Sequence, residues 1–314
     1  MTPSGLRLIF MGTPEFAVPS LQALIDHGEQ VVAVVTQPDR PKGRGRVLAP
    51  SPVKLLAVAA GIEVLQPTKV RNEAFVDELR ALGPDLILVA AYGRILTPAV
   101  LGVPRLGCIN VHGSLLPKYR GAAPIQTAIL RGEQEAGVTI MCMDAGLDTG
   151  DMLLKGALPV SEQETSATLI PKLAELGGKL LIQVLAQAAQ GKLHPEQQDE
   201  TLATLAPPLT KEDGMIQWHN SAQAISCQIR ALDPWPTATT LYAGKQLKPF
   251  APTVLNEPAS ALPGTIVRAG KEGLVIACGQ GLLQVAEIQF EGKKRMPVHS
   301  FLLGHPLTVG TVLG

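Results

Sequence analysis

The sequence CINVHGSLLPKYRG, residues 108–121, begins as a buried strand and ends in a loop. It carries Asn110 and His112 two positions apart. Because side chains on a strand alternate between its two faces, these two polar groups point the same way. In an open parallel sheet, ligands bind outside the carboxyl ends of the strands. The stretch therefore predicts a sheet strand that ends in a polar site.

Four other short apolar runs predict the rest of that sheet. They are LRLIFM at 6–11, VVAVVT at 31–36, DLILVAAYG at 85–93 and GVTIMCM at 137–143. Runs that are apolar on both faces favour parallel strands covered by helices on both sides. Thr13 and Pro14 predict the N-cap and first turn of a helix, and leucines at three- and four-residue steps predict a long helix over 165–189. We therefore expect residues 1–189 to form an α/β, Rossmann-like parallel-sheet domain.

The second part of the chain has a different composition and hydrophobic pattern. Residues 190–208 are polar, contain prolines and lack a clear period, which predicts a linker. Residues 209–314 contain an amphipathic helix pattern at 219–232, followed by brief strands separated by glycine-containing turns. This rhythm predicts a smaller, antiparallel, OB-like β-barrel domain.

Composition excludes several classes of protein. The 314 residues include 27 basic and 27 acidic side chains, so nucleic-acid binding would need local basic patches. No apolar run approaches the roughly 18 residues of a membrane span. Four separated cysteines, with no Cys-x-x-Cys pair, argue against a zinc site and a disulfide framework. The chain lacks a Walker A pattern, a G-x-G-x-x-G motif and histidines at metal-ligand spacing. We expect a reduced, soluble, cytoplasmic protein without a bound metal.

The sequence after the 137–143 run offers a third polar group. It reads DAGLDTGD at 144–151, and if its strand lies beside 108–112, one aspartate can face His112. An Asn amide can donate to an oxyanion, a His can move a proton near neutral pH, and a carboxylate can hold the imidazole. This set suits acyl transfer to an amine, which attacks without a Ser or Cys nucleophile. The pattern alone leaves Asp144, Asp148 and Asp151 open, and its plain structural explanation is a satisfied strand end beside an ordinary turn.

Two long motifs carry a resemblance to a known family. NVHGSLLPKYRGAAPIQ at 110–126 and GVTIMCMDAGLDTGDML at 137–153 resemble the formyltransferases that use 10-formyltetrahydrofolate. The resemblance implies that Asn110, His112 and Asp148 are the catalytic set. It also implies that 10-formyltetrahydrofolate is the co-substrate and that its site is lined by Ser114, Leu115, Leu116, Pro117, Ile95 and Leu96.

The whole chain is most similar to the methionyl-tRNA formyltransferase branch of this family. FMGTPEFAVPSL at 10–21, TQPDRPKGRG at 36–45 and RALDPWP at 230–236 carry this likeness. It implies transfer of a formyl group to the α-amino group of methionine on initiator tRNA, for translation initiation, by a monomer. One alternative is a sugar-nucleotide formyltransferase with the same two-domain plan. Another is a folate- or RNA-binding module without catalysis, against which the intact catalytic set argues.

Two basic segments are candidate tRNA contacts. The loop DRPKGRGRVL at 39–48 contains Arg40, Lys42, Arg44 and Arg46, and in the resembling family it reaches the acceptor end of the tRNA. Flexible basic segments can follow phosphates and become ordered on binding. In the second domain, the consecutive Lys293, Lys294 and Arg295 offer a weaker phosphate contact. From charge alone, both segments also suit solvated surface loops.

Overall fold

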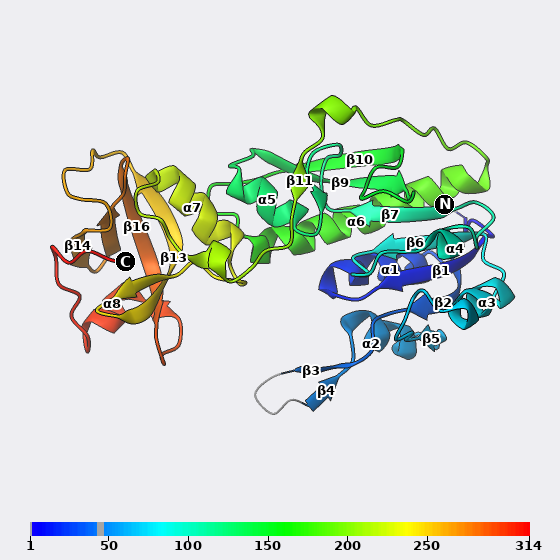
Figure 1. Ribbon diagram of the computed structural model, residues 1–314, viewed down its shortest axis with the longest axis horizontal. Helices are drawn as coiled ribbons and strands as arrows, with labels where there is room; N and C mark the ends of the chain where they lie inside the picture. The colour runs from blue at the N-terminus through cyan, green and yellow to red at the C-terminus, as the bar shows by residue number, and fades with distance from the viewer. Residues whose placement is uncertain (1, 43–46) are drawn as a thin grey trace. The chain divides into compact units, whose positions relative to one another are not determined.

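The computed structural model describes residues 2–42 and 47–314 (Figure 1). The chain forms two compact units. The first contains the residues up to 124 together with 136–158 and 170–206. The second contains 125–135, 159–169 and 207–314. Each unit is therefore built from several stretches of chain, and the contiguous boundaries at 189 and 209 stay a prediction.

The first unit is built on a seven-stranded sheet in the order β10-β9-β7-β6-β1-β2-β5. Its parallel part pairs β1 with β2 and β6, β6 with β7, and β2 with β5. This arrangement confirms the predicted α/β fold with a parallel sheet. The strands are β1 (Arg7–Gly12), β2 (Gln30–Val35), β5 (Val64–Leu65), β6 (Leu86–Ala90), β7 (Cys108–His112), β9 (Glu135–Cys142) and β10 (Met152–Pro159).

Strand β9 departs from the sequence prediction. It lies beside β7, but the two strands run antiparallel, with His112 opposite Thr139 and Ile109 opposite Cys142. The strand is buried along most of its length, so its apolar pattern looks like that of a parallel strand. Hydrophobic pattern reports burial and not direction, and sheets that mix parallel and antiparallel strands are common. The predicted parallel direction of this strand is therefore wrong.

The helices of the first unit pack closely against this sheet. In α6 (Ser166–Ala189), which confirms the predicted long helix, a Cβ added at Gly177 would lie 2.7 Å from Val111 Cγ1 on β7. The absence of a side chain there lets the helix approach the strand. The other helical segments of the first unit are η1 (Glu15–Ala17), α1 (Val18–Asp26), α2 (Pro52–Ala59), α3 (Glu73–Ala81), α4 (Pro98–Leu101) and η2 (Glu200–Leu202). Helix α5 (Pro124–Leu130) belongs to the second unit except for its first residue.

Thr13 does not cap a helix. The hydroxyl of Thr13 donates instead to the backbone oxygen of Tyr92, 3.1 Å away, and α1 begins only at Val18 after one 3-10 turn. The predicted N-cap is therefore wrong. Thr13 links the end of β1 to the end of β6, because its hydroxyl donates to a distant carbonyl and does not accept from a helix N–H.

Two short strand pairs complete the description of the first unit. The hairpin of β3 (Arg40–Lys42) and β4 (Val47–Ala49) follows β2. The parallel pair of β8 (Arg120–Gly121) and β11 (Leu205–Ala206) joins two segments that are far apart in the sequence. The latter pair brings the end of the predicted linker onto the loop after β7.

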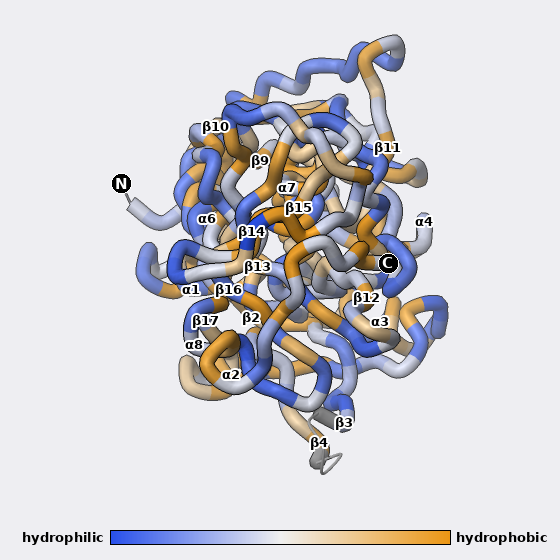
Figure 2. Tube along the Cα trace, turned by 90° about the vertical axis from the view of Figure 1, so that its left-hand side faces the viewer, coloured by the Kyte–Doolittle hydropathy of each residue, from blue (hydrophilic) through white to orange (hydrophobic). Residues whose placement is uncertain are grey.

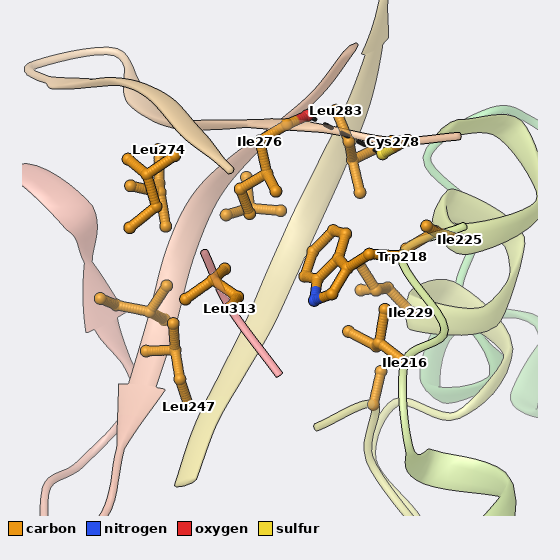
Figure 3. Packing of buried hydrophobic residues seen from close by; sticks show 14 of the residues in the cluster. Ile216, Trp218, Ile225, Ile229, Leu247, Leu274, Ile276, Cys278, Leu283 and Leu313 are labelled. Carbon is orange, nitrogen blue, oxygen red and sulfur yellow. Dashed lines mark hydrogen bonds between the residues drawn. The ribbon is translucent and has the colours of Figure 1, made fainter. Parts of the chain in front are cut away.

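The second unit is an antiparallel half-barrel, which confirms the predicted β domain. Its strands have the order β12-β13-β16-β15-β14, and β17 pairs with β16. The core contains Trp218, which lies beside Ile216 and Ile229 (Figure 3). Its indole N–H donates to Thr240 Oγ1 at 2.9 Å. The elements are η3 (Glu212–Gly214), α7 (Ala222–Ala231), β12 (Thr240–Tyr242), β13 (Lys245–Leu255), β14 (Ile266–Gly270), β15 (Gly273–Ala277), β16 (Leu282–Phe290), β17 (Met296–Pro297) and α8 (Val298–Leu302).

Hydropathy along the chain follows this architecture. Strand β15 is buried over its whole length and is among the orange segments of Figure 2. Helix α7 turns Ile225 and Ile229 into the same core, as its amphipathic pattern predicted. Within residues 2–42 and 47–314, none of the helices is long and apolar enough to cross a membrane.

Candidate active site

Strand β7 presents Asn110 and His112 at its carboxyl end. The strand is buried throughout, and the two side chains are only 9% and 5% exposed. Asn110 pairs in register with Val89 of β6. Both polar side chains contact the same carboxylate, that of Asp148, so they lie on one face as their spacing predicted.

Asp148 reaches these residues by a route that the sequence did not indicate. Because β9 runs antiparallel to β7, its loop leaves near Ile109, at the opposite end of β7 from His112. The loop must then fold back along the sheet. Two features allow this return: Asp148 adopts a left-handed backbone with φ of 52°, and Gly150 lies so close to the Cys142 carbonyl that a Cβ would stand 2.0 Å from its oxygen.

The folded-back loop completes a cluster of three polar side chains. Asn110 Nδ2 lies 3.5 Å from Asp148 Oδ1, and His112 Nδ1 lies 3.6 Å from Asp148 Oδ2. The backbone N–H of Gly121 donates to Asp148 Oδ2 at 2.9 Å and stabilises its negative charge. The geometry thus brings together the three residues that the resemblance implied.

The other two aspartates of the loop do not join this cluster. The Asp144 carboxylate accepts from the Gly146 backbone N–H at 3.0 Å and from the Thr149 hydroxyl at 2.8 Å, which is ordinary turn chemistry. Asp151 contributes its backbone oxygen, which accepts from the Cys142 N–H at 2.8 Å. Spatial arrangement therefore distinguishes three aspartates that the sequence pattern left equal.

The surroundings of His112 fix where its proton lies. Nε2 is 3.0 Å from the backbone oxygen of Tyr119, and because a carbonyl only accepts, Nε2 carries the hydrogen. Burial lowers the pKa of His112 below its usual value, although the Asp148 carboxylate and the Tyr119 carbonyl act in the opposite direction. At neutral pH the imidazole is therefore uncharged, and Nδ1 is the atom that can take up a proton.

The loop after β7 is held by residues that the sequence analysis did not identify. Thr139 of β9 is fully buried, accepts from the Leu116 N–H at 3.1 Å and donates to the Ser114 carbonyl at 2.7 Å. Lys155 donates to the Leu116 carbonyl at 3.1 Å. A threonine within an otherwise apolar strand was the only sequence signal for Thr139. These contacts give the Ser-Leu-Leu-Pro loop one defined conformation.

The residues predicted to line the folate site differ in their exposure. Ser114 and Leu116 are buried, while Leu115 and Pro117 are half-buried. In the loop after β6, Ile95 is 80% exposed, whereas Leu96 is packed into the core of the first unit. An exposed apolar side chain can pack against the flat apolar ring system of a ligand. The folate contacts of both residues stay a prediction.

The basic segment after β2 borders a pocket of about 420 Å³. Arg40 lines it and donates to the Gln37 side chain. Thr13, Gln37 and Ala91 place the pocket at the carboxyl ends of β1, β2 and β6. For Lys42 only the backbone in β3 is described, and the predicted contacts Arg44 and Arg46 lie outside the described residues.

The basic triplet of the second unit is not uniform. Arg295 forms ion pairs with Asp233 at 3.0 Å and Glu287 at 2.6 Å, and its guanidinium lies 4.0 Å from the Phe250 ring centre. These contacts make it a structural residue of the half-barrel. Lys293 and Lys294 are exposed. Phosphate binding by the triplet remains a prediction that rests on these two lysines.

Comparisons with known proteins agree with this architecture. The family model described as "Formyl transferase" matches residues 6–185, and that described as "Formyl transferase, C-terminal domain" matches residues 208–306. The methionyl-tRNA formyltransferase of Citrifermentans bemidjiense is 52% identical over 311 residues, which cover 99% of this chain and 97% of that protein. The methionyl-tRNA formyltransferase of Desulfotalea psychrophila is 54% identical over 309 residues, which cover 98% and 96%.

A solved structure shares the fold at lower identity. The N-formyltransferase from Helicobacter canadensis, in complex with folinic acid and dTDP-3-aminofucose, has a TM-score of 0.69 and 21% identity, and the match covers 89% of this chain and 98% of that one. At this identity the likeness concerns the fold alone. The two relatives described above share about half of their residues with this chain over nearly its whole length. The chain therefore belongs to the methionyl-tRNA formyltransferase family.

Proposed function

We propose that this chain transfers the formyl group of 10-formyltetrahydrofolate to the α-amino group of methionine on initiator tRNA. The products are N-formylmethionyl-tRNA, which serves translation initiation, and tetrahydrofolate. The observation that carries the proposal is the cluster of Asn110, His112 and Asp148 in a chain about half identical to methionyl-tRNA formyltransferases. Metal chemistry is not part of the proposal.

The reaction needs one bond made, one bond broken and one proton moved. The amine nitrogen attacks the formyl carbon, and the formyl oxygen gains negative charge. The bond from the formyl carbon to the folate nitrogen N10 then breaks. Overall, the amine loses a proton and N10 gains one. A catalyst must therefore stabilise the oxyanion and provide a path for the proton.

The three clustered residues divide this work. Asn110 carries an amide donor at the strand end, so we assign to it the hydrogen bond to the developing oxyanion. His112 is uncharged at neutral pH and takes up the amine proton at Nδ1. Asp148 then lies beside the resulting imidazolium and stabilises it. Return of the proton to N10, directly or through a water, completes the cycle.

We assign the two substrates to opposite sides of this cluster. The folate ring packs on the Ser-Leu-Leu-Pro loop after β7 and on Ile95, which is exposed in the loop after the neighbouring strand β6. The aminoacyl end of the tRNA enters from the β3–β4 hairpin, which carries the basic segment and borders the pocket at the ends of β1, β2 and β6. Since the acceptor is an aminoacyl-tRNA, we place the activity in the cytoplasm.

A competition among acceptors tests the proposal. Labelled 10-formyltetrahydrofolate is offered with methionyl-initiator tRNA, methionyl-elongator tRNA, free methionine and a nucleotide-linked amino sugar. We expect transfer to the initiator species alone. Transfer only to the amino sugar would keep the chemistry of the cluster but make this a sugar-nucleotide formyltransferase. Folate binding without transfer to any acceptor would make it a binding module.

A further inference from the structure

The segment from Gln198 to Ala206, predicted to belong to a linker, returns to the candidate active site. Gln198 is only 5% exposed. Its amide Nε2 donates to two backbone oxygens of the catalytic loop, that of Asp148 at 2.8 Å and that of Gly150 at 2.7 Å. The first carbonyl belongs to Asp148, which adopts a left-handed backbone, and the second lies two residues further along the loop. One side chain therefore holds the backbone of the loop from its strained residue to Gly150.

The orientation of the Gln198 amide is fixed from both ends. Its Oε1 accepts from Arg120 Nε at 3.1 Å and from Arg120 Nη2 at 2.9 Å. Arginine can only donate and carbonyl oxygens can only accept. Rotation of the amide by half a turn would place donors against donors and acceptors against acceptors. The amide thus has one orientation, and with it the loop has one position.

Arg120 is in turn held at its far side. The guanidinium is 5% exposed and forms a bidentate ion pair with Glu200, with N–O distances of 2.9 and 2.7 Å. Bidentate pairs of this kind restrict direction as well as distance. The next residue, Gly121, donates its N–H to the Asp148 carboxylate. A series of hydrogen bonds therefore leads from Glu200 through Arg120 and Gln198 to the Asp148 backbone.

The same segment also holds the partner of His112. Thr204 accepts from the Arg120 N–H through its backbone oxygen at 2.8 Å and from the Tyr119 N–H through its hydroxyl at 2.9 Å. The Tyr119 carbonyl in turn accepts from His112 Nε2. Both sides of the His112–Asp148 contact are thus braced by residues of one segment, over 80 positions away from His112 in the sequence.

We propose that Gln198 is a positioning residue for formyl transfer, which holds the Asp148 loop so that its carboxylate faces His112 and Asn110. The proposal rests on the proposed function, because it assumes that Asp148 takes part in the reaction. Gln198 acts through Asp148 and does not touch the substrates. Its loss should therefore lower kcat and leave both KM values nearly unchanged.

The sharpest test is Gln198→Glu, with Gln197→Glu as the matched control. The glutamate keeps an oxygen for Arg120 but loses the N–H donors, and it turns a charged oxygen towards the Asp148 and Gly150 carbonyls. Gln197 is the exposed neighbour, so the same change there should leave the kinetics unchanged. For Gln198→Glu we expect kcat to fall roughly 10- to 100-fold, as for other residues that orient catalytic groups, with KM within about threefold.

A double-mutant cycle separates positioning from general damage. In single-turnover measurements, Gln198→Glu is combined with Asp148→Asn. If Gln198 acts through Asp148, Gln198→Glu should lower the rate only slightly in a variant that already carries Asp148→Asn. A fall in kcat that multiplies fully with that of Asp148→Asn, or an unchanged kcat in Gln198→Glu alone, would overturn the proposal. Should the glutamate variant fail to fold, Gln198→Met, similar in length and uncharged, is judged by the same criteria.

The activity of the wild-type enzyme distinguishes failure of the proposed function from failure of the positioning role. If wild type does not formylate methionyl-tRNA, the proposed function fails, whatever Gln198 does. If wild type is active and Gln198→Glu matches it, only the positioning role fails.

Discussion

Nδ1 of His112 lies 3.6 Å from the Asp148 carboxylate, although the loop that carries Asp148 leaves its strand at the opposite end of β7. The contact exists because the loop folds back and is held there by hydrogen bonds to its own backbone. It couples a buried imidazole to a negative charge. Several measurable consequences follow from this coupling and from the packing around it.

The first concerns the pH dependence of Asp148→Asn. The Asp148 carboxylate raises the pKa of His112 against the effect of burial, so its removal lowers that pKa further. Activity as a proton acceptor rises as the pH increases through this pKa. The acidic limb of kcat/KM should therefore move to lower pH, while kcat falls by about 10²–10⁴. A limb that stays in place with an unchanged rate would show that Asp148 and His112 are not coupled in catalysis.

The second concerns the oxyanion donor. Asn110→Ala removes the amide at the end of β7 and should lower kcat by about 10²–10³ with little change in either KM. Asn72 provides the contrast, because its side chain caps α3 by accepting from the Ala74 N–H at 3.3 Å. Asn72→Ala should cost about 1 kcal/mol of stability and no kcat. Steady-state kinetics and thermal unfolding of both variants test this opposite pattern.

The third concerns tRNA recognition. Arg44→Ala should raise KM for methionyl-tRNA and leave the folate affinity unchanged. The plot of log binding constant against log salt concentration should become shallower by about one unit of slope. Arg295→Ala should instead lower thermal stability, because it leaves Asp233 and Glu287 without their shared cation. Equal losses of tRNA and folate affinity in Arg44→Ala would mean that the β3–β4 region shapes the folate site.

The fourth concerns packing between α6 and the catalytic strand. Gly177→Ala should gain up to about 1 kcal/mol of helix propensity, but its Cβ would stand 2.7 Å from Val111 Cγ1 in the buried sheet. Overpacking of this kind costs about 1–3 kcal/mol, so we expect net destabilisation and a displaced Asn110. Gly304, where an added Cβ meets nothing within 4 Å, is the control. A higher melting temperature for Gly177→Ala would contradict the expected tight contact.

Local patterns were sufficient for much of the fold. The apolar runs gave the inner strands β1, β2, β6 and β7, and the spacing of leucines gave α6. The amphipathic pattern gave α7, and short strands with glycine turns gave the half-barrel. These elements follow the sequence because the burial of a strand or helix is decided by periods of two or about 3.6 residues within the element itself.

The candidate site was only partly accessible in this way. Spacing alone placed Asn110 and His112 on one face, because both belong to one strand. Spacing did not distinguish the three aspartates of the loop after β9. Only the family resemblance indicated Asp148. Spacing also missed Gln198 and Thr139, because nothing near them in the chain indicates which distant groups they meet.

By itself, the sequence determined the inner strands of the sheet, helices α6 and α7, the polar strand end and the family. The tertiary structure decided the antiparallel direction of β9, the return of the Asp148 loop and the bracing of that loop by residues 198–206. The physical reason is that periodicity records how each residue is buried, whereas strand direction and hydrogen-bond partners depend on groups brought together from distant parts of the chain.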